Sequence, residues 1–245
     1  MESFVMRLKP GLRKIPGYRI ARFVWQLARG AESRHAALIL LRPPKALYQP
    51  YGTTSSDRYP DIFRYVREAI EDGPNLRILS FGCATGEEVF TLRCYFPQAV
   101  ITGIDINPLN IAVCRFRRMR IGDRQMSFAV AGSAAAEADA SYDVVFAMAV
   151  FRHGDLNTSP PPRQSSHRIR FADFEESTAD LARILRPNGL LVIQNAMFRF
   201  ADTRASRGFK AELRVKRDQL APLYGCDDRL LLDAEACDVV FRKIR

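Results

Sequence analysis

The chain has 245 residues, 47% of them hydrophobic, which is enough to bury the core of one α/β catalytic domain that carries an extension. Its five cysteines are scattered, odd in number and without C-x-x-C spacing, so they favour a reducing cytoplasm and argue against structural zinc or another metal site. The net charge of +10 favours acidic partners, and the longest apolar run near the start, Ala36–Leu41, is too short to span a bilayer.

Most of the charge lies near the start of the chain. Residues 1–50 carry ten Lys and Arg against two Glu, a net charge of +8, which leaves +2 for the rest. An amphipathic helix is predicted here from four apolar residues at helical spacing, Ile20, Phe23, Val24 and Leu27. This stripe either packs on the catalytic domain or lies on a membrane, while the basic residues favour docking on an anionic leaflet or a nucleic acid. We therefore predict a basic helical extension, 1–56, and a catalytic domain, 57–245.

A predicted strand and a glycine loop organise the rest of the chain. After a helix that begins at Pro60, the apolar pair Ile78 and Leu79 predicts a buried strand. Gly82 and Gly86 follow and lead into a segment with helical apolar spacing. A strand that passes through glycines into a helix is typical of a cofactor site, because the backbone can approach a ligand closely and the helix N-terminus offers free N–H groups.

An acidic residue ends the next predicted strand, 100–105. Asp105 lies about twenty residues after the glycine loop, a spacing that brings the carboxylate beside the loop at the carboxyl edge of a parallel sheet. There it can accept hydrogen bonds from both hydroxyls of a ribose. The loop and Asp105 together predict a ligand that contains adenosine.

The loop differs from a dinucleotide-binding fingerprint. The middle glycine of G-x-G-x-x-G lets a pyrophosphate lie on the backbone, whereas this loop has Ala84 there, followed by Glu87 and Glu88. Two carboxylates at a helix start would repel a pyrophosphate and suit a ligand with a cationic end, such as S-adenosylmethionine. The alternatives are that both glutamates only compensate the helix dipole, or that the chain is an NAD-dependent oxidoreductase.

The run G-C-A-T-G-E-E, from Gly82 to Glu88, resembles class I S-adenosylmethionine-dependent methyltransferases, and in particular the G-C-S-T-G-E-E loop of the chemotaxis-receptor glutamate methyltransferases. The resemblance covers residues 75–195. It implies a doubly wound, mostly parallel, seven-stranded α/β sheet of Rossmann-like type that ends in a reversed C-terminal strand pair. It also implies that the chain is an enzyme with S-adenosyl-L-methionine as cofactor, acting on an acceptor that the sequence does not identify.

The resemblance further implies a set of cofactor contacts. In the family an acid usually ends the first strand and holds the methionine amino group; Ser80 stands there in this chain, and Glu87 is expected to take over the role. Ser133, after the predicted strand 126–130, stands where a polar residue lies beside the adenine. Cys83 is expected to be a small loop residue rather than a nucleophile. The complete expected set is Ser80, Gly82, Cys83, Ala84, Gly86, Glu87, Asp105, Ile106 and Ser133.

A helix is predicted to begin at Asn107-Pro108. Three of its apolar residues, Ala112, Phe116 and Met119, are expected to face the core. Its arginines at 115, 117, 118 and 120 are expected to form a solvated outer face.

By the resemblance, the strand 142–150 ends where the transferable methyl group would lie. Residues 148–151 lack the Asn/Asp-Pro-Pro-aromatic pattern of amino-directed nucleic-acid methyltransferases, which counts against adenine or cytosine N-methylation. His153 is a candidate general base, although it can equally be structural or orient the substrate, because alignment alone can carry much of a methyl transfer. The polar, Pro-rich stretch 154–170 is predicted to be a substrate lid.

The remaining predicted elements are a helix from Asp173, a strand over 190–194, and two closing strands over 209–215 and 239–243. A third functional alternative is a protein that binds S-adenosylmethionine without turnover and associates with a membrane or RNA. We expect a cytoplasmic protein, with peripheral contact to a membrane surface through the basic extension. The sequence leaves the oligomeric state open.

Overall fold

The structure of the protein is a computed structural model that describes residue 48 and residues 55–216, 222–232 and 236–244. Nearly all of the predicted basic extension lies outside the described residues. Its amphipathic helix, its docking on an acidic surface and the boundary at residue 56 therefore stay predictions. Within the described part of the chain, no helix is long and apolar enough to cross a membrane.

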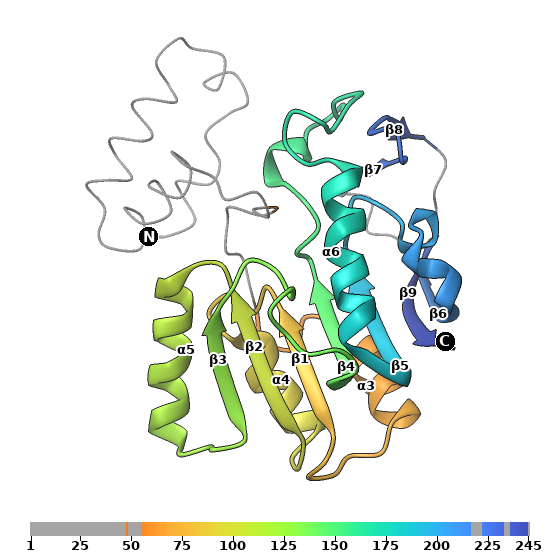
Figure 1. Cartoon of the computed structure of the whole chain (residues 1–245). Coiled ribbons are helices and arrows are strands. Elements are labelled where there is room, and N and C mark those ends of the chain that lie inside the picture. The colour runs from red at the N-terminus through yellow and green to blue at the C-terminus, as the bar shows by residue number, and fades with distance from the viewer. Residues whose placement is uncertain (1–47, 49–54, 217–221, 233–235, 245) are drawn as a thin grey trace, which may run out of the picture. The chain divides into compact units, whose positions relative to one another are not determined.

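A seven-stranded sheet forms the centre of the described structure, with the strand order β3-β2-β1-β4-β5-β9-β6 (Figure 1). Strands β1 to β5 are mutually parallel, and β9 is antiparallel to both of its neighbours, β5 and β6. This confirms the predicted mostly parallel sheet with an antiparallel C-terminal pair, in which β9 carries the reversal. The strands are β1 (Arg77–Phe81), β2 (Val100–Asp105), β3 (Met126–Val130), β4 (Tyr142–Met148), β5 (Leu185–Gln194), β6 (Phe209–Lys216) and β9 (Ala236–Lys243).

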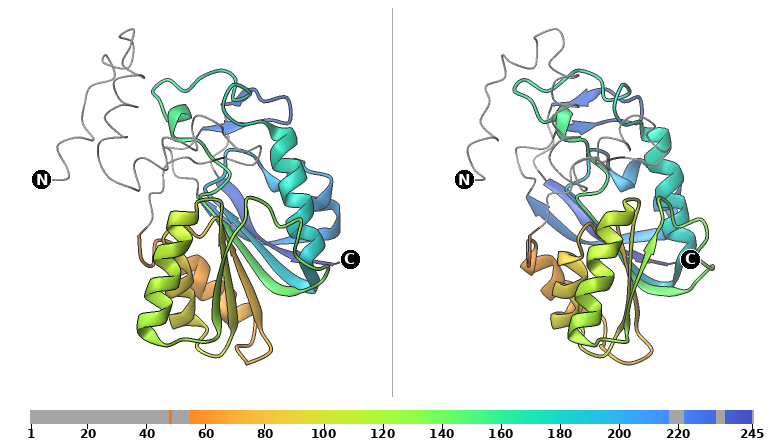
Figure 2. Two further views of the ribbon diagram at one scale, coloured as in Figure 1. Left: turned by 60° about the vertical axis from the view of Figure 1, so that its left-hand side comes forward. Right: turned by 90° about the vertical axis from the view of Figure 1, so that its left-hand side faces the viewer.

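Helices cover both faces of this sheet, which is why its central strands are apolar without alternation. One core contains buried apolar residues of α3 (Pro60–Ala69), α4 (Glu87–Tyr95) and α5 (Pro108–Ile121). The other core contains buried apolar residues of α6 (Phe171–Ile184), which lies on the opposite face in Figures 1 and 2. The described residues also form three short 3-10 turns: η3 (Gly154–Leu156), η4 (Phe200–Asp202) and η5 (Ala205–Gly208).

The inward face of α5 differs from the prediction. Ala112, Phe116 and Met119 are exposed, Phe116 by 56% and Met119 by 67%, so the expectation that they face the core is wrong. Ile111 and Cys114 are the apolar residues of α5 that are buried. The helix therefore presents only a narrow apolar contact to the sheet.

Arginines of α5 explain this arrangement, because two of them lie against the edge strand β3. Arg115 donates to the carbonyl of Phe128 at 2.8 Å, and Arg118 donates to the carbonyl of Met126 at 3.1 Å. A carbonyl on the free side of an edge strand needs a partner and would otherwise be open to pairing with another strand. The arginine run that the sequence suggested was a solvated face is thus partly an edge cap.

A small hairpin, β7 (Leu223–Tyr224) with β8 (Leu230–Leu231), was not predicted, and it holds the stretch 154–170 in place. The Leu230 N–H donates to the carbonyl of Arg163 at 3.0 Å, and the Tyr224 hydroxyl donates to the carbonyl of Pro162 at 3.1 Å. Figure 1 shows the hairpin beside this loop, beyond the first turn of α6. The stretch is therefore packed against the domain, and its role as a substrate lid stays a prediction.

Asp228 in the hairpin loop caps the first turn of α6, 57 residues earlier in the chain. Its Oδ1 accepts a hydrogen bond of 2.6 Å from the Phe171 N–H, and its backbone has a left-handed φ of 63°. We expect Asp228→Ala to lower the free energy of unfolding by about 1–2 kcal/mol, because alanine removes the cap and disfavours that backbone conformation. Asp228→Asn keeps an acceptor oxygen and should lose less. Equal urea midpoints for the wild type and the alanine variant would contradict this role.

Candidate cofactor site

The glycine loop turns over the end of β2. The N–H groups of Gly82 and Cys83 both donate to the Ile104 carbonyl, at 2.8 and 2.9 Å. Gly82 has a φ of 73°, and a Cβ there would lie 2.5 Å from Cγ2 of Val150. Only glycine combines this backbone conformation with such close contact. The loop is therefore fixed against both β2 and the residues that follow β4.

The second half of the loop leads into α4 at Gly86, whose φ is 91°. A Cβ on Gly86 would lie 2.9 Å from the Phe90 ring and 3.0 Å from the Cys114 sulfur. Ala84 also has a positive φ, 47°, which is uncommon for a residue with a side chain. Because Gly86 immediately precedes α4, the first-turn N–H groups of the helix lie at this loop, as predicted for a cofactor site.

Asp105 fixes this loop as well as ending β2. Its Oδ2 accepts from the Ala84 N–H at 2.9 Å, and its Oδ1 accepts from the Asn107 N–H at 2.8 Å and from Nδ2 of Asn110 at 3.0 Å. The side chain is nearly buried, and burial raises the pKa of the carboxyl group although the three hydrogen bonds oppose this. The structure thus brings Asp105 to the loop as predicted, next to Ile106 and the start of α5.

The two glutamates that begin α4 point to different partners. Glu88 is half-buried, and its Oε1 accepts a hydrogen bond of 2.7 Å from the hydroxyl of Ser80, a fully buried residue of β1. Burial raises the pKa of Glu88 to about 7, with the Ser80 hydrogen bond acting in the opposite direction. The carboxyl group of Glu88 therefore lies beside Ser80, the β1 residue that stands where the family usually has an acid.

Glu87, which the sequence analysis favoured, lies against α5 instead. Its carboxylate forms an ion pair with Arg117, with Nη1 2.6 Å from Oε1, and accepts from the Ser56 hydroxyl at 3.1 Å. The hydrogen bond from Arg117 lowers the pKa of Glu87. Adjacent positions on a helix point about 100° apart, so the sequence could not decide which glutamate faces Ser80.

Cys83 is buried beside a second thiol. A hydrogen bond with Cys114 and burial both raise the pKa of the Cys83 thiol, and its sulfur lies 3.8 Å from the Ala84 carbonyl oxygen. A nucleophilic cysteine needs a lowered pKa and access to its substrate. These surroundings agree with the expectation of a small loop residue.

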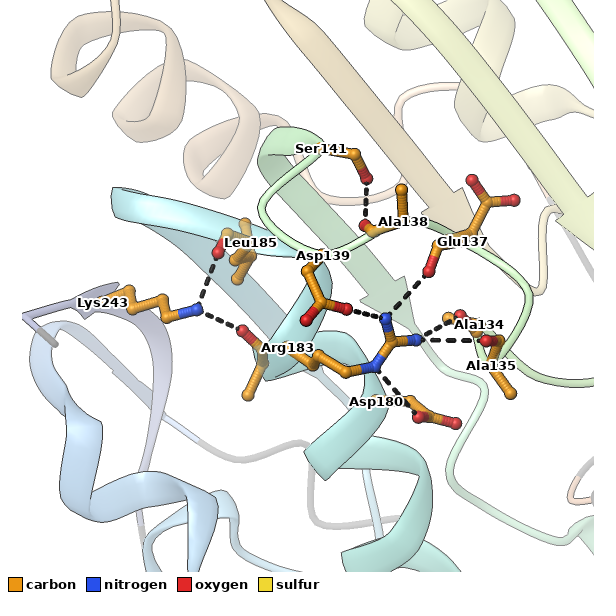
Figure 3. A network of polar contacts seen from close by, with 11 residues as sticks. Ala134, Ala135, Glu137, Ala138, Asp139, Ser141, Asp180, Arg183, Leu185 and Lys243 are labelled. Carbon is orange, nitrogen blue, oxygen red and sulfur yellow. Dashed lines mark hydrogen bonds and ion pairs between the residues drawn. The ribbon is translucent and has the colours of Figure 1, made fainter.

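Ser133 lies in the loop that follows β3. Arg183 of α6 holds the part of this loop that comes after Ser133 (Figure 3). Nη2 of Arg183 donates to the carbonyls of Ala134 and Ala135 at 3.1 and 3.3 Å, and Nη1 donates to the carbonyl of Glu137 at 2.9 Å and to the carboxylate of Asp139. One guanidinium group thus contacts four residues that follow Ser133. These contacts hold the loop at the carboxyl edge of the sheet, where Ser133 is expected to lie beside the adenine.

The chain leaves β4 through a constrained turn. Ala149 has a φ of 57°, and its N–H donates to the Gln194 carbonyl at 2.8 Å, while Val150 contacts the glycine loop. Asn195, which follows β5 and was not predicted, has the same φ, and its Nδ2 donates to the Tyr59 hydroxyl at 3.3 Å. Left-handed non-glycine residues concentrate at functional sites. The carboxyl ends of β4 and β5 are therefore constrained beside the loop.

His153 begins the 3-10 turn η3 and is nearly buried. Its Nδ1 accepts a hydrogen bond of 3.2 Å from the Asp155 N–H, so the neutral ring carries its proton on Nε2. Burial lowers the pKa of His153, and the nearby Arg168 and His167 lower it further, although Asp155 opposes them. With Nδ1 engaged and Nε2 protonated, the ring is arranged to donate a hydrogen bond rather than to accept a proton.

Comparison with known proteins decides the family. A family model described as a methyltransferase domain matches residues 72–222, which is more than half of the chain. The chain belongs to this methyltransferase family. The predicted enzyme class, the Rossmann-like fold and S-adenosyl-L-methionine as the family's cofactor are thereby confirmed. No curated protein matches the chain significantly.

Solved structures share parts of the fold at low identity. The YcgJ protein from Bacillus subtilis is 14% identical with a TM-score of 0.42, covering 55% of this methyltransferase and 50% of its own chain. Geranyl diphosphate C-methyltransferase from Streptomyces coelicolor A3(2) is 12% identical with a TM-score of 0.40, covering 55% and 44%. Phosphoethanolamine N-methyltransferase 2 from Haemonchus contortus is 17% identical with a TM-score of 0.45, covering 70% and 35%. This methyltransferase thus spans half or less of the length of these three proteins.

Proposed function

We propose that this methyltransferase holds S-adenosyl-L-methionine between the glycine loop and Asp105 and transfers its methyl group to an acceptor at the carboxyl end of β4. In this proposal Glu88, rather than Glu87, receives the methionine ammonium group, and Asp105 receives the ribose. Ser133 lies on the adenine side. The observation that carries the assignment is the hydrogen bond between the half-buried Glu88 and the buried Ser80, near the end of the central strand β1.

The chemistry of this position fits the cofactor. A carboxylate that is partly removed from water is costly unless a cation compensates it, and the raised pKa of Glu88 reflects that cost. Among the described residues, no ion pair includes Glu88, whereas Glu87 is neutralised by Arg117. An ammonium group beside Glu88 would supply the missing positive charge. A pyrophosphate at the same place would add a second negative charge, which disfavours the NAD-dependent alternative.

Bound S-adenosylmethionine supplies an electrophilic methyl group on a sulfonium. The chain's own part is to hold both ends of the cofactor and to align an acceptor with the methyl group. The constrained residues Ala149 and Val150 after β4 fix the backbone beside that acceptor. His153, which begins η3, is the candidate residue to orient the acceptor. A general base is not required by this arrangement.

The resemblance of the loop to chemotaxis-receptor glutamate methyltransferases concerns the way the cofactor is held. We do not extend it to receptor glutamates as substrates, because function depends on the acceptor site and not on the fold. The acidic-surface partner of the basic extension likewise stays a proposal, and its test is the salt dependence of binding to anionic vesicles and to RNA.

Titration calorimetry tests the proposed cofactor directly. We expect the full chain to bind S-adenosylhomocysteine and S-adenosylmethionine but not NAD. Binding of NAD with no binding of either adenosyl ligand would refute the proposal. A protein that binds without turnover would never release S-adenosylhomocysteine, so mass spectrometry of S-adenosylmethionine incubated with the protein and an extract of small molecules separates an enzyme from a binding protein.

A further inference from the structure

One arginine of α5 contacts both sides of Gly86. Nη1 of Arg117 donates to the Thr85 carbonyl at 2.8 Å and to Oε1 of Glu87 at 2.6 Å, and Nη2 donates to Oε2 of Glu87 at 3.2 Å. The guanidinium group also lies over the Phe90 ring, with Cζ 4.1 Å from the ring centroid. Four contacts from one side chain therefore join α5 to the loop and to the first turn of α4.

We propose that Arg117 is a positioning residue that sets the rotation of the first turn of α4 and so delivers Glu88 to the cofactor. The inference rests on the proposed function for the role of Glu88. Gly86 gives the backbone between Thr85 and Glu87 unusual freedom, because glycine lacks the side chain that restricts other residues. Arg117 removes this freedom because it holds the Thr85 carbonyl oxygen before Gly86 and the Glu87 carboxylate after it. A planar guanidinium can make such a two-point contact, whereas the ammonium of lysine is a single point of charge.

The contact also decides which of the two glutamates faces the site. With Glu87 held on α5, the following residue is turned toward Ser80 on β1, to which its carboxyl group is hydrogen-bonded. If Glu87 were released from Arg117, the first turn of α4 could rotate. Either carboxylate could then face solvent or the N–H groups at the helix N-terminus. Arg117 therefore acts on the cofactor through Glu87 and the loop backbone rather than by touching the ligand.

Arg118 offers a matched control on the same helix. It also donates to a backbone carbonyl, that of Met126 in β3, and like Arg117 it is half-buried. Among the described residues, its hydrogen bond is to the edge strand and not to the glycine loop. Arg117→Gln and Arg118→Gln thus remove comparable arginines, one facing the loop and one facing the sheet edge.

The experiment compares the affinity for S-adenosylhomocysteine, the melting temperature and the hydrogen exchange of the loop amides in both variants of the full chain. We expect Arg117→Gln to weaken binding by about fivefold or more and to speed amide exchange over residues 85–89, whereas Arg118→Gln changes neither. Arg117→Lys should fall between wild type and Arg117→Gln. In a double-mutant cycle, Glu87→Gln should add little to Arg117→Gln, because the two side chains form one contact.

Two outcomes overturn the inference. The first is a folded Arg117→Gln protein with wild-type affinity and wild-type loop exchange, and the second is an equal loss of affinity in both variants. If the wild type binds no S-adenosylhomocysteine, the proposed function fails by itself. The exchange comparison then decides separately, since unchanged protection over residues 85–89 in Arg117→Gln refutes the positioning role and a local loss of protection supports it.

Discussion

Replacing Glu88 with glutamine should make the protein more stable at pH 8 while weakening its cofactor binding. The pKa of Glu88 is raised from 4.5 to about 7, so the folded state binds the proton more tightly than the unfolded state. The free energy of unfolding therefore falls as the pH rises from 4.5 through 7, by about 3 kcal/mol in all. Glutamine keeps an acceptor for Ser80 without titrating, so Glu88→Gln should recover most of that loss at pH 8.

Its neighbour supplies a control of opposite sign. The pKa of Glu87 is lowered by Arg117, so its contribution to stability is present above 4.5 and is lost as the pH falls through the lowered value. Glu87→Gln should therefore be less stable than wild type at pH 8. Urea unfolding of the wild type and both variants between pH 4.5 and 8 measures the two effects. Parallel stability curves for wild type and Glu88→Gln over that range would show that the folded structure does not raise the pKa of this carboxyl group.

Cofactor affinity should show the matching pH dependence. An ammonium ligand favours ionised Glu88, so affinity for S-adenosylhomocysteine should fall by about tenfold for each pH unit below 7. Glu88→Gln should bind roughly 10- to 100-fold more weakly at pH 8 and lose this dependence, because a charged hydrogen bond is absent at every pH. Calorimetry at several pH values tests this. If Glu88→Gln binds S-adenosylhomocysteine with wild-type affinity, then a residue other than Glu88 holds the ammonium group.

Asp105→Ala should have the second large effect, because it removes a ligand contact and a structural one together. Three donors on Ala84, Asn107 and Asn110 lose their acceptor, which should lower the free energy of unfolding by about 2–4 kcal/mol. Loss of the proposed ribose contacts should weaken S-adenosylhomocysteine binding by roughly 10- to 100-fold. Thermal unfolding and calorimetry of the same preparation measure the two effects.

Asp105→Asn separates the two contributions. Asparagine keeps one acceptor oxygen for some of the three donors but places an N–H₂ group, itself a donor, toward the rest. The free energy of unfolding should therefore fall by less than in Asp105→Ala. If affinity falls as far as in Asp105→Ala while stability is mostly kept, the ribose contact is the cause. A folded Asp105→Ala protein with unchanged affinity would refute the ribose role.

The sequence predicted the sheet well, because buried parallel strands are continuous apolar runs bounded by turns. β2 and β3 have the predicted bounds, and β4 and β9 differ from them by a few residues at one end. The glycine loop and Asp105 were brought together as predicted, since both lie at the carboxyl ends of neighbouring strands. The local sequence pattern was sufficient to predict a strand wherever both of its faces are packed against helices.

What could not be predicted depends on contacts that are distant in sequence. The inward face of α5 is set by arginines that reach carbonyls of β3, so apolar periodicity gave the wrong face for Phe116 and Met119. The β7-β8 hairpin consists of two-residue strands, too short for a pattern, and its partner is a loop some sixty residues earlier. The glutamate that faces Ser80 is Glu88, while its neighbour Glu87 contacts an arginine of another helix, and local pattern carries no information on that contact.

The position of β9 has a consequence for the order in which the protein is completed during synthesis. β9 pairs with β5 on one side and β6 on the other, through Val240, Phe241 and their neighbours, although it leaves the ribosome after both of them. Until residues 236–243 emerge, β5 offers an open edge and β6 lacks the strand with which it pairs in the described structure. An emerging chain therefore exposes two strands that each have an unpaired edge. Such edges can pair with a non-native strand or with another chain. The pairing of both edges, on β5 and on β6, therefore has to wait for a single segment, residues 236–243.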